Sequence, residues 1–433
     1  MRNHSGKSFQ SFFNPSNPVQ NHPKLNLMLN NGRGLFQLAV IVSALGFFVD
    51  VYDLLLFAII RKSSLAALGL TPDQILTQGE LLISVQMIGL LIGGILFGII
   101  GDKKGRLSVL FGSILLYSIA NILNGMVHTV PQYLVLRFIA GIGLAGELGA
   151  GLTLVSEMLP KEKRSLAAGL IAGFGVLGAV AAFGMSKVFD WRMCYYIGGI
   201  LGFVLLLMRV SVSESGLFKQ VQQTDVQRGN FLQFFTNRER FGRYIRCILI
   251  GVPVWYVIGV LVTFSDQFGK AFGIPDIDPG MAIMYLYIFV GMGDLAVGWL
   301  SERLKSRKKT LFLFMTITIF FCVLFFLQNG GSAWSFYLLV MGLGFGAGFN
   351  VVYMTMGVEQ FGTNLRASAA ISIPNMVRGA LPLIILLFKF TRNLFQDYVT
   401  GAWVTGVILF AIAIAAAWTM EETYGKDLDF LEH

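Results

Sequence analysis

The sequence predicts an all-α membrane protein whose twelve transmembrane helices form two halves of six. Of its 433 residues, 55% are hydrophobic and 13% are charged, and the mean hydropathy is +0.69, whereas soluble domains carry about 25% charged residues. Apolar runs of the roughly 20 residues needed to cross a bilayer recur along the chain. These runs lack the alternation of barrel strands, so helices must satisfy the backbone hydrogen bonds.

The predicted helices follow one another with few long connections. Their centres lie near residues 47, 90, 117, 144, 176, 201, 254, 291, 319, 346, 379 and 409. The longest internal polar stretch, at 211–242, divides them six and six. We therefore expect an N-terminal bundle at 35–210, a cytoplasmic linker at 211–242 and a C-terminal bundle at 243–420.

The two ends of the chain predict tails. Residues 1–34 are rich in Asn, Ser, Pro and Gln and lack the uninterrupted apolar core of a signal peptide, so they predict a disordered cytoplasmic tail. Residues 421–433 predict a second, short cytoplasmic tail.

Positive residues collect in alternate loops, and this distribution predicts the orientation. Those loops contain Lys103, Lys104, Arg106, Lys161, Lys163, Arg164, Arg228, Arg238, Arg240, Arg243, Arg303, Lys305, Arg307, Lys308 and Lys309. The intervening loops carry few positive residues. By the positive-inside rule both termini are cytoplasmic. The net charge of +9 therefore reflects topology, and no nucleic-acid partner is expected.

The sequence shows no motif for a cofactor, a metal or a catalytic centre. Its four histidines are scattered without ligand spacing, and its three cysteines lie in or beside predicted spans. Neither a catalytic triad nor a phosphate loop is present. We expect no enzyme activity and no cofactor.

The stretch RFIAGIGLAGELGAGLTL at 137–154 contains the pattern G-x-G-x-x-G, at Gly141, Gly143 and Gly146. A dinucleotide site requires a strand before this pattern and a helix that starts within it, whereas here the pattern lies inside one span. Small residues also allow membrane helices to approach closely. The glycines therefore predict helix packing.

An internal repeat relates the two halves. Glu157 precedes Arg164 by seven positions and RSLAAG follows, while Glu359 precedes Arg366 by seven and RASAAI follows. GIIGDKKGR at 98–106 has GWLSERLKSR at 298–307 as its counterpart, at nearly the same offset of about 200 positions. Repeated halves with a site between them are typical of transporters. A duplicated scaffold without transport is the alternative.

Ionisable residues inside spans cost at least about 2.5 kcal/mol on insertion scales, so they need a partner or a function. Asp50 and Asp53 lie three apart in the first span and hence on one helical face. Arg137 begins the fourth span at the level of Asp53, by a rise of about 1.5 Å per residue. We predict an Asp53–Arg137 ion pair with Asp50 nearby, used for proton coupling, or else a purely structural pair.

Two further charges lie near the bilayer centre. Glu147, with no partner apparent in the sequence, is a candidate proton carrier, and locking of helix ends is the alternative. Arg378 lies on a polar stripe with Ser372, Asn375 and Pro382. A guanidinium there suits a carboxylate or phosphate, unless Asp294 neutralises it.

Other polar and aromatic residues complete the candidate cavity. Besides Arg378 and Asn375, the predicted substrate-binding residues are Asn121, Gln86, Trp255, Tyr256, Tyr285 and Asn350. Asn124, Tyr287 and Tyr353 were weaker candidates. Each of these residues, taken singly, is more often packing or part of an interfacial belt.

The motif G-x-x-x-D-K-x-G-R at Gly98, Asp102, Gly105 and Arg106 resembles the signature loop between helices two and three of the major facilitator superfamily. The resemblance covers about residues 35 to 420 and implies alternating access. The second copy departs from the motif, with Glu302 for Asp and Lys305 for Gly. We predict a cytoplasmic gate that separates and re-forms in each cycle. The alternative is that the basic residues of these loops only determine the topology. The predicted gate residues are Gly98, Asp102, Arg106, Glu157, Arg164, Glu302, Arg303, Glu359 and Arg366.

Within the superfamily, GFFVDVYDLLLFA, RFIAGIGLAGELGAG, SEMLPKEKRSLAAG and DWRMCYYIGGILGFVLLLMRVSVSES resemble the metabolite:proton and sialate or lactate:proton symporter groups. In those proteins the acid corresponding to Asp53 and the arginine corresponding to Arg137 are expected to form a proton-linked pair, and Glu147 corresponds to the acid of their A-G-E segment. The GDYP motif of phosphate symporters is missing from the fourth span. The PESPR-like run of sugar porters is also missing, and ESGLF stands in its place.

Together these features predict a proton-coupled symporter that takes up a small organic anion such as a carboxylate. The resemblance implies a multi-pass protein of the bacterial inner membrane that acts as a monomer, with protons, a small molecule and the lipid bilayer as its partners. The alternatives are an exporter of metabolites or drugs, an importer of a zwitterion, amino acid, sugar or siderophore, and a transport-dead sensor or membrane enzyme.

Overall fold

The computed structural model describes residues 23–158, 161–210 and 231–426. Within these ranges it leaves out the side chains of residues 23–39, 102, 152, 156–158, 161–170, 363, 364, 366 and 367. Asp102, Glu157, Arg164 and Arg366, four of the predicted gate residues, therefore lie outside the described side chains.

The N-terminal half consists of seven helices in the described residues. They are α1 (Pro23–Ala67), α2 (Pro72–Lys104), α3 (Arg106–Asn124), α4 (Val130–Leu144), α5 (Glu147–Met158), α6 (Lys161–Val188) and α7 (Trp191–Arg209). Helix α1 begins at Pro23, inside the segment 1–34 that we predicted as a tail.

The C-terminal half follows the same plan with shorter pieces. Its elements are α9 (Gln233–Thr236), α10 (Arg238–Tyr256), the π-helix η2 (Val257–Val262), α11 (Ser265–Ala271), α12 (Pro279–Leu304), α13 (Arg307–Phe326), α14 (Ala333–Gly346), α15 (Phe349–Glu359), α16 (Thr363–Gly379), α17 (Leu381–Phe395) and α18 (Tyr398–Trp418).

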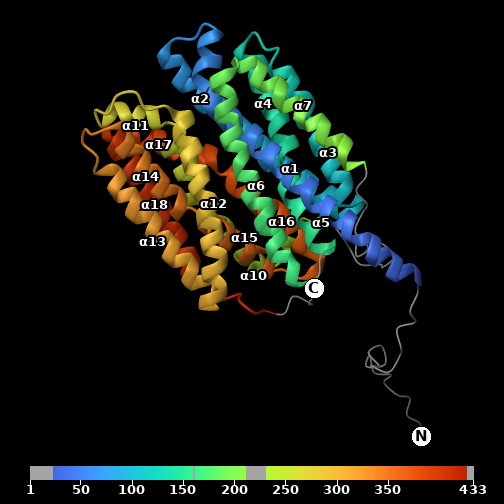
Figure 1. Cartoon of the computed structure of the whole chain (residues 1–433). Coiled ribbons are helices and arrows are strands. Elements are labelled where there is room, and N and C mark those ends of the chain that lie inside the picture. Colours follow the sequence, from blue (N-terminus) through green and yellow to red (C-terminus); the bar gives the residue numbers. More distant parts are fainter. Residues whose placement is uncertain (1–22, 159–160, 211–230, 427–433) are drawn as a thin grey trace.

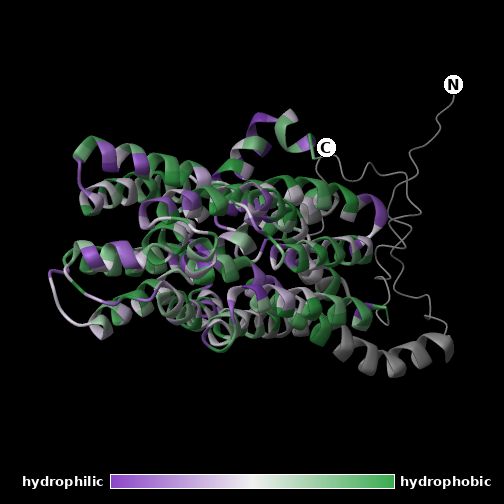
Figure 2. Ribbon diagram, turned by 90° about the horizontal axis from the view of Figure 1, so that it is seen from above, coloured by the Kyte–Doolittle hydropathy of each residue, from purple (hydrophilic) through white to green (hydrophobic). Residues whose placement is uncertain are grey.

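Twelve stretches of these helices are long and apolar enough to cross a membrane, from Val40–Ala67 to Tyr398–Trp418. Each predicted centre lies inside one of them, so the predicted number and order of spans are confirmed. Apolar residues extend along most of the ribbon (Figure 2). Many large apolar side chains, such as Leu207, Leu383 and Trp418, are exposed, as a lipid-facing surface requires.

The two halves lie side by side and meet along two helix pairs. Helix α2 packs against α16, and α6 packs against α12. Helices α6 and α12 run next to each other at the front of Figure 1. The α2–α16 contact is close because it uses glycines. A Cβ at Gly94 would lie 2.6 Å from the Cβ of Asn375, and one at Gly379 would lie 2.5 Å from that of Leu91.

The glycines of the 137–154 stretch serve helix packing, as predicted. A Cβ at Gly143 would lie 2.7 Å from the backbone nitrogen of Tyr117 in α3, and one at Gly146 would lie 2.8 Å from the Cβ of Ser113. At Gly141 a Cβ would collide with the carbonyl oxygen of Gln86 in α2. The pattern lies inside a membrane span, with helix before and after it. A dinucleotide-binding fold would instead have a strand before the pattern.

The repeat also appears as helix interruptions at matching places. The fourth span breaks between α4 and α5 at residues 145–146, and the tenth breaks between α14 and α15 at 347–348. The eleventh breaks between α16 and α17, where Pro382 lies in the first turn of α17 and cannot donate a backbone hydrogen bond. Each break leaves helix ends inside the membrane, where their partial charges act on nearby side chains.

We call the end of the bundle that carries the turns at 105 and 305 the terminal end, and the opposite end, with the turns near 125, 275 and 330, the distal end. Gly105 has φ 101° and its counterpart Lys305 has φ 49°. The second copy of the motif therefore keeps a positive φ at this position, although a lysine has replaced the glycine. Residues with a side chain adopt a positive φ only at a cost.

The terminal end should face the cytoplasm, because it carries the basic loops. Cysteines introduced at Lys305 and Asn329, both exposed and at opposite ends, test this orientation. A membrane-impermeant maleimide added to intact cells should label the cysteine of Asn329→Cys and leave that of Lys305→Cys unlabelled until the cells are permeabilised. The reverse pattern would contradict the orientation.

Candidate functional site

Several charged side chains lie buried inside the spans. Each is at most 6% exposed, and the set comprises Asp50 and Asp53 in α1, Arg137 in α4, Glu147 in α5, Arg209 in α7 and Arg378 in α16. They form three groups: one inside the N-terminal half around Arg137, one locking that half through Glu147, and one between the halves around Arg378.

Arg137 lies beside Asp53 but does not bond to it directly. Its Nη2 donates to Oδ1 of Asn121 at 2.9 Å, and its guanidinium lies 5.0 Å from the ring centre of Tyr195. Both carboxylate oxygens of Asp53 are buried without a hydrogen-bond partner, although Arg137 is the main charge acting on this group. The predicted direct ion pair is therefore wrong for this conformation: Nη2 of Arg137 is bound by Asn121, and its Nε and Nη1 are buried without a hydrogen-bond partner.

Asn121 thus has a different contact from the predicted one. We predicted that it binds substrate, but its carbonyl oxygen holds Arg137. The Asp53 carboxylate instead faces α7, where a Cβ at Gly198 would lie 2.5 Å from Oδ1. An acid without a hydrogen bond beside a cation held by a neutral amide is a group that can exchange a proton.

Glu147 is paired, contrary to its isolated appearance in the sequence. Arg209 at the end of α7 contacts both of its carboxylate oxygens, with Nη1 3.0 Å from Oε2 and Nη2 on Oε1. Both side chains are 1% exposed. Glu147 is also the first residue of α5, where the helix dipole favours a negative charge.

Gly46 in α1 makes room for this ion pair. A Cβ at position 46 would collide with both Oε1 of Glu147 and Nη2 of Arg209. The ion pair therefore connects α5 to α7, and it packs against α1 at Gly46. This arrangement supports the locking role that we considered as the alternative for Glu147.

Arg378 lies between the halves at the end of α16. It is 6% exposed, and its guanidinium lies 5.9 Å from the ring centre of Trp255 in α10, near the limit for a cation–π interaction. Among the described residues it forms no hydrogen bond or ion pair. Its place in the last turn of α16 favours a cation there.

Asp50 is the acid that Arg378 acts on most directly. It lies in α1 of the opposite half, it is fully buried, and neither of its oxygens has a hydrogen-bond partner. Arg378 is the main charge acting on it, followed by Glu147. The alternative partner, Asp294 in α12, forms no ion pair with Arg378 among the described contacts, and Oδ1 of Asp294 is itself unpartnered.

Two tyrosines complete the surroundings of Arg378. Tyr287 in α12 and Tyr353 in α15 are buried, and Arg378 is the main charge acting on each. The Tyr353 hydroxyl has no hydrogen-bond partner. Both tyrosines were weaker candidates in the sequence, which offers no signal that separates them from packing residues.

The remaining predicted substrate residues divide into two groups. Nδ2 of Asn375 donates across the halves to the carbonyl oxygen of Ala145, 2.9 Å away, at the break between α4 and α5. Gln86 is buried with Nε2 unpartnered, and Asn350 is half-buried. These three and Trp255 stay candidates.

Tyr256 and Tyr285, two further predicted cavity residues, have contacts within the C-terminal half. The Tyr256 hydroxyl donates to the carbonyl oxygen of Ala402 in α18 at 2.6 Å, on the side of the C-terminal half away from α1. Tyr285 packs edge-on against the exposed Trp334, with ring centres 6.0 Å apart. Alternate residues of a helix face different sides, so the sequence could not tell Trp255 and Tyr287 from their neighbours.

The charges at the terminal end of the C-terminal half centre on Arg307. Its guanidinium contacts Glu302 at 3.2 Å and Glu359 at 3.0 Å, and Thr423 donates to Glu359 at 2.6 Å. We had predicted Arg303, but its guanidinium lies over the ring of Trp299. Arg307 is the true counterpart of Arg106, which donates to the carbonyl oxygen of Gly101 at 3.1 Å.

Sequence reasoning missed Arg209 and Arg307 for identifiable reasons. Arg209 lies at the end of a predicted span and was not considered as a buried charge. Arg307 follows a one-residue insertion in the repeat and was interpreted as a topology signal. At Gly98 a Cβ would meet no neighbouring atom, so the packing does not explain why a glycine stands there.

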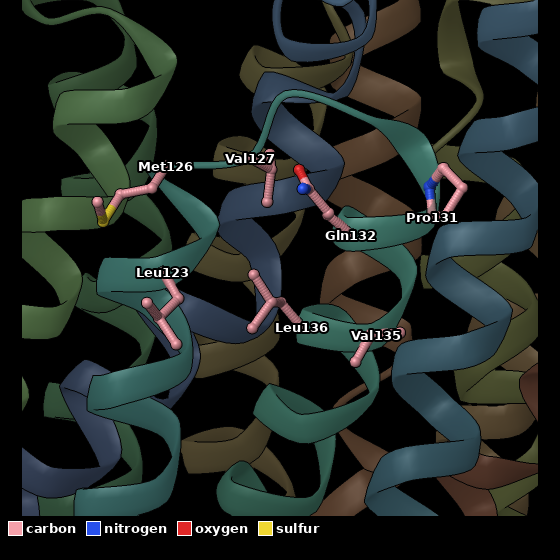
Figure 3. A pocket seen from close by; sticks show the side chains of 7 residues that line it. All are labelled: Leu123, Met126, Val127, Pro131, Gln132, Val135 and Leu136. Atoms are coloured by element: carbon pink, nitrogen blue, oxygen red, sulfur yellow. The ribbon is translucent and has the colours of Figure 1, made fainter.

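The described surface recesses lie away from these charges. One lies between the distal ends of α3 and α4 and is lined by Leu123, Met126, Val127, Pro131, Gln132, Val135 and Leu136 (Figure 3). Another lies between α10, α13 and α18 and includes Tyr256 and Trp403. Both are apolar and suit lipid chains rather than an anion.

Comparisons with known proteins agree with this architecture. The Major Facilitator Superfamily model matches residues 38–385. A putative metabolite transport protein of Haemophilus influenzae is 27% identical over 90% of this chain and 97% of its own length. The sialic acid transporter NanX of Escherichia coli K12 is 26% identical over 89% of this chain and 92% of its own length.

A solved structure has a similar fold. The proton:xylose symporter XylE superposes with a TM-score of 0.69 and 17% sequence identity, covering 92% of this chain and 98% of its own. At this identity the likeness concerns the fold alone. The relatives and the fold are those of transporters rather than enzymes.

The Glu147–Arg209 ion pair can be tested by stability. Arg209→Met should destabilise the protein by about 3–5 kcal/mol, because it leaves a buried carboxylate unpaired, and Arg209→Met with Glu147→Leu should recover most of that loss. Thermal unfolding of the purified protein measures both, with the exposed Arg303→Met as the control. If the double variant is as unstable as the single one, the pair is not the reason for the loss.

Proposed function

The chain belongs to the major facilitator superfamily, and we propose that it is a proton-coupled symporter that takes up a small organic anion, with a carboxylate as the simplest candidate. Transport by a multi-pass protein of the bacterial inner membrane follows from the family and the twelve spans. The substrate class, the coupling to protons and the direction are our proposal, as are the cytoplasmic termini and the monomeric state.

The observation that carries the substrate class is the unpaired Arg378 between the halves. A buried guanidinium is costly unless an anion compensates it, and here no described carboxylate bonds to it. Its planar donors match a carboxylate in bidentate geometry. Trp255, Tyr287 and Tyr353 surround it with aromatic faces and hydroxyls, which suit a small organic anion better than a bare inorganic ion.

The coupling to protons rests on Asp50 and Asp53, whose four carboxylate oxygens have no hydrogen-bond partner. Asp50 acts on Arg378 from the opposite half, so it competes with a substrate anion for the same cation. A proton on Asp50 removes this competition, and a substrate carboxylate then takes its place at Arg378. Asp53 beside Arg137 passes the proton on within the N-terminal half.

Glu147 has a different role in this scheme. Because Arg209 contacts both of its oxygens, we assign it to holding α5 against α7 rather than to carrying the proton. The break between α4 and α5, at which Asn375 contacts Ala145, then stays rigid while the halves rock.

Substitution of the proposed proton groups should uncouple transport. In proteoliposomes, Asp53→Asn should abolish uptake driven by an inward proton gradient while it retains exchange of substrate across the membrane, because exchange needs no net proton movement. Sialic acid, lactate and benzoate form the first panel of labelled substrates, and the exposed Asp73→Asn is the control. Wild-type uptake that persists with the gradient collapsed would refute the coupling.

Substitution of Arg378 should abolish binding. Arg378→Ala should lower affinity by at least about tenfold, since a charged hydrogen bond contributes about 1.5–3 kcal/mol, and Arg378→Lys should restore only part of it because an ammonium lacks the bidentate fork. Binding to purified protein by scintillation proximity gives both affinities, and Arg303→Ala is the control. An unchanged affinity would remove the anion assignment.

A further inference from the structure

A second group of charges joins the halves at the distal end, and the proposed function does not use it. Arg61 at the end of α1 and its neighbour Lys62 contact the two carboxylate oxygens of Asp266 in α11, at 3.2 and 2.9 Å. Glu80 in α2 contacts Lys389 at 2.6 Å and Arg392 at 3.8 Å, both in α17. We call these six residues the distal cluster.

Three residues of the distal cluster are buried, and its other three cations reach the surface: the side chain of Lys62 is 49% exposed, that of Lys389 31% and that of Arg392 26%. The side chains of Arg61, Asp266 and Glu80 are 2–3% exposed. Arg61 lies 4.3 Å from the ring centre of Phe264, and a Cβ at Gly79 would lie 2.5 Å from its Cδ. Burial alone would raise the pKa of Asp266, but Arg61 and Lys62 outweigh it and hold this pKa below its usual range, so the carboxylate is charged.

The distal cluster has more cations than acids. Four cations, Arg61, Lys62, Lys389 and Arg392, face two carboxylates. Nε and Nη1 of Arg61 are buried and have no hydrogen-bond partner. Three other acids at this end, Asp190, Asp278 and Asp397, cap helices with their side chains, and Asp73 and Asp276 are exposed. The excess positive charge therefore lies at the seam itself.

The terminal end is different in the part of the chain that the structure describes. There the ion pairs of Arg307 stay within the C-terminal half. At the distal end every pair of the cluster crosses between the halves, as does the ion pair of Lys187 with Asp278. Opening of the distal end therefore separates Glu80 and Asp266 from cations of the opposite half and leaves those cations facing water.

We propose that the distal cluster is a capture site for a carboxylate, in which Glu80 and Asp266 hold the cations while the halves are closed and an incoming carboxylate replaces them when the halves part. The incoming carboxylate then supplies part of the negative charge that Glu80 and Asp266 supply to the cations in the closed state. The proposal rests on the proposed function for its choice of anion, and the site would deliver that anion toward Arg378.

The test measures the charge preference of the opened site without any substrate. Ser265, the neighbour of Asp266 in α11, is fully buried, so we expect a cysteine in its place to react faster when the distal end opens. In nanodiscs, Ser265→Cys should react with the anionic sulfonatoethyl methanethiosulfonate faster than with the cationic trimethylammonium reagent. Relative to the exposed Asn329→Cys, we expect a preference of about threefold or more at low salt, which falls toward one at 1 M salt.

Two charge variants separate the parts of the proposal. Glu80→Gln with Asp266→Asn should raise the reaction of Ser265→Cys with both reagents, because the halves lose their latch. Lys389→Gln with Arg392→Gln should reduce the anion preference without slowing the cationic reagent, because only Arg61 and Lys62 remain. The reactivity of Asn329→Cys should be unchanged in both backgrounds, which controls for the reagents themselves, and a single symmetric gel-filtration peak shows that the variants are folded.

The proposal is overturned if the preference at Ser265→Cys equals that at Asn329→Cys, if loss of both α17 cations leaves it undiminished, or if Ser265→Cys reacts no faster when Glu80 and Asp266 are neutralised. These outcomes are independent of uptake. A failed uptake assay with an intact anion preference would reject the proposed function alone, while normal uptake without the preference would reject the capture site alone.

Discussion

The rest of the structure depends on one constraint: a charge inside the membrane must be compensated, and Arg378 is not compensated by any direct contact among the described residues. Arg378 is 6% exposed at the end of an interrupted helix, with a tryptophan ring nearby and an unbonded acid, Asp50, in the opposite half. Such a group is stable only if something else pairs with it for part of the time. An anion that arrives and leaves satisfies this condition, and so does a protein carboxylate that gains and loses a proton.

Two other buried charges are held by neighbouring side chains. Arg209 holds Glu147, and Asn121 holds Arg137. The N-terminal half can therefore move as a unit, while Asp50 and Asp53 in α1 each have two buried carboxylate oxygens without a hydrogen-bond partner. At the distal end the ion pairs run between halves, whereas the described pairs around Arg307 stay within one half. This is the pattern of a molecule closed at its distal end, with the bonds to be broken located where it next opens.

The sequence predicted the fold well because span length and hydropathy decide it. All twelve predicted centres lie in spans, and the repeat is visible again in matching helix breaks and in the left-handed turns at Gly105 and Lys305. The buried charged positions of the candidate site were visible in the sequence for a similar reason, since ionisable residues stand out in apolar helices. The sequence could not predict partners. Glu147 is paired by Arg209 from another span, Asn121 intervenes between Asp53 and Arg137, and Tyr256 faces away from its neighbour Trp255, because rotation of a helix and contacts across distant segments are set by tertiary packing.

The most direct measurement counts protons. Titration calorimetry of the purified protein with the carboxylate that it transports, in two buffers of different ionisation enthalpy, gives the number of protons taken up per anion bound. If Asp50 and an anion compete for Arg378, binding should take up protons at neutral pH, and Asp50→Asn should bind the anion without this uptake. Binding that moves no proton in the wild-type protein, or uptake that is unchanged in Asp50→Asn, would contradict the competition of acid and substrate for one buried arginine.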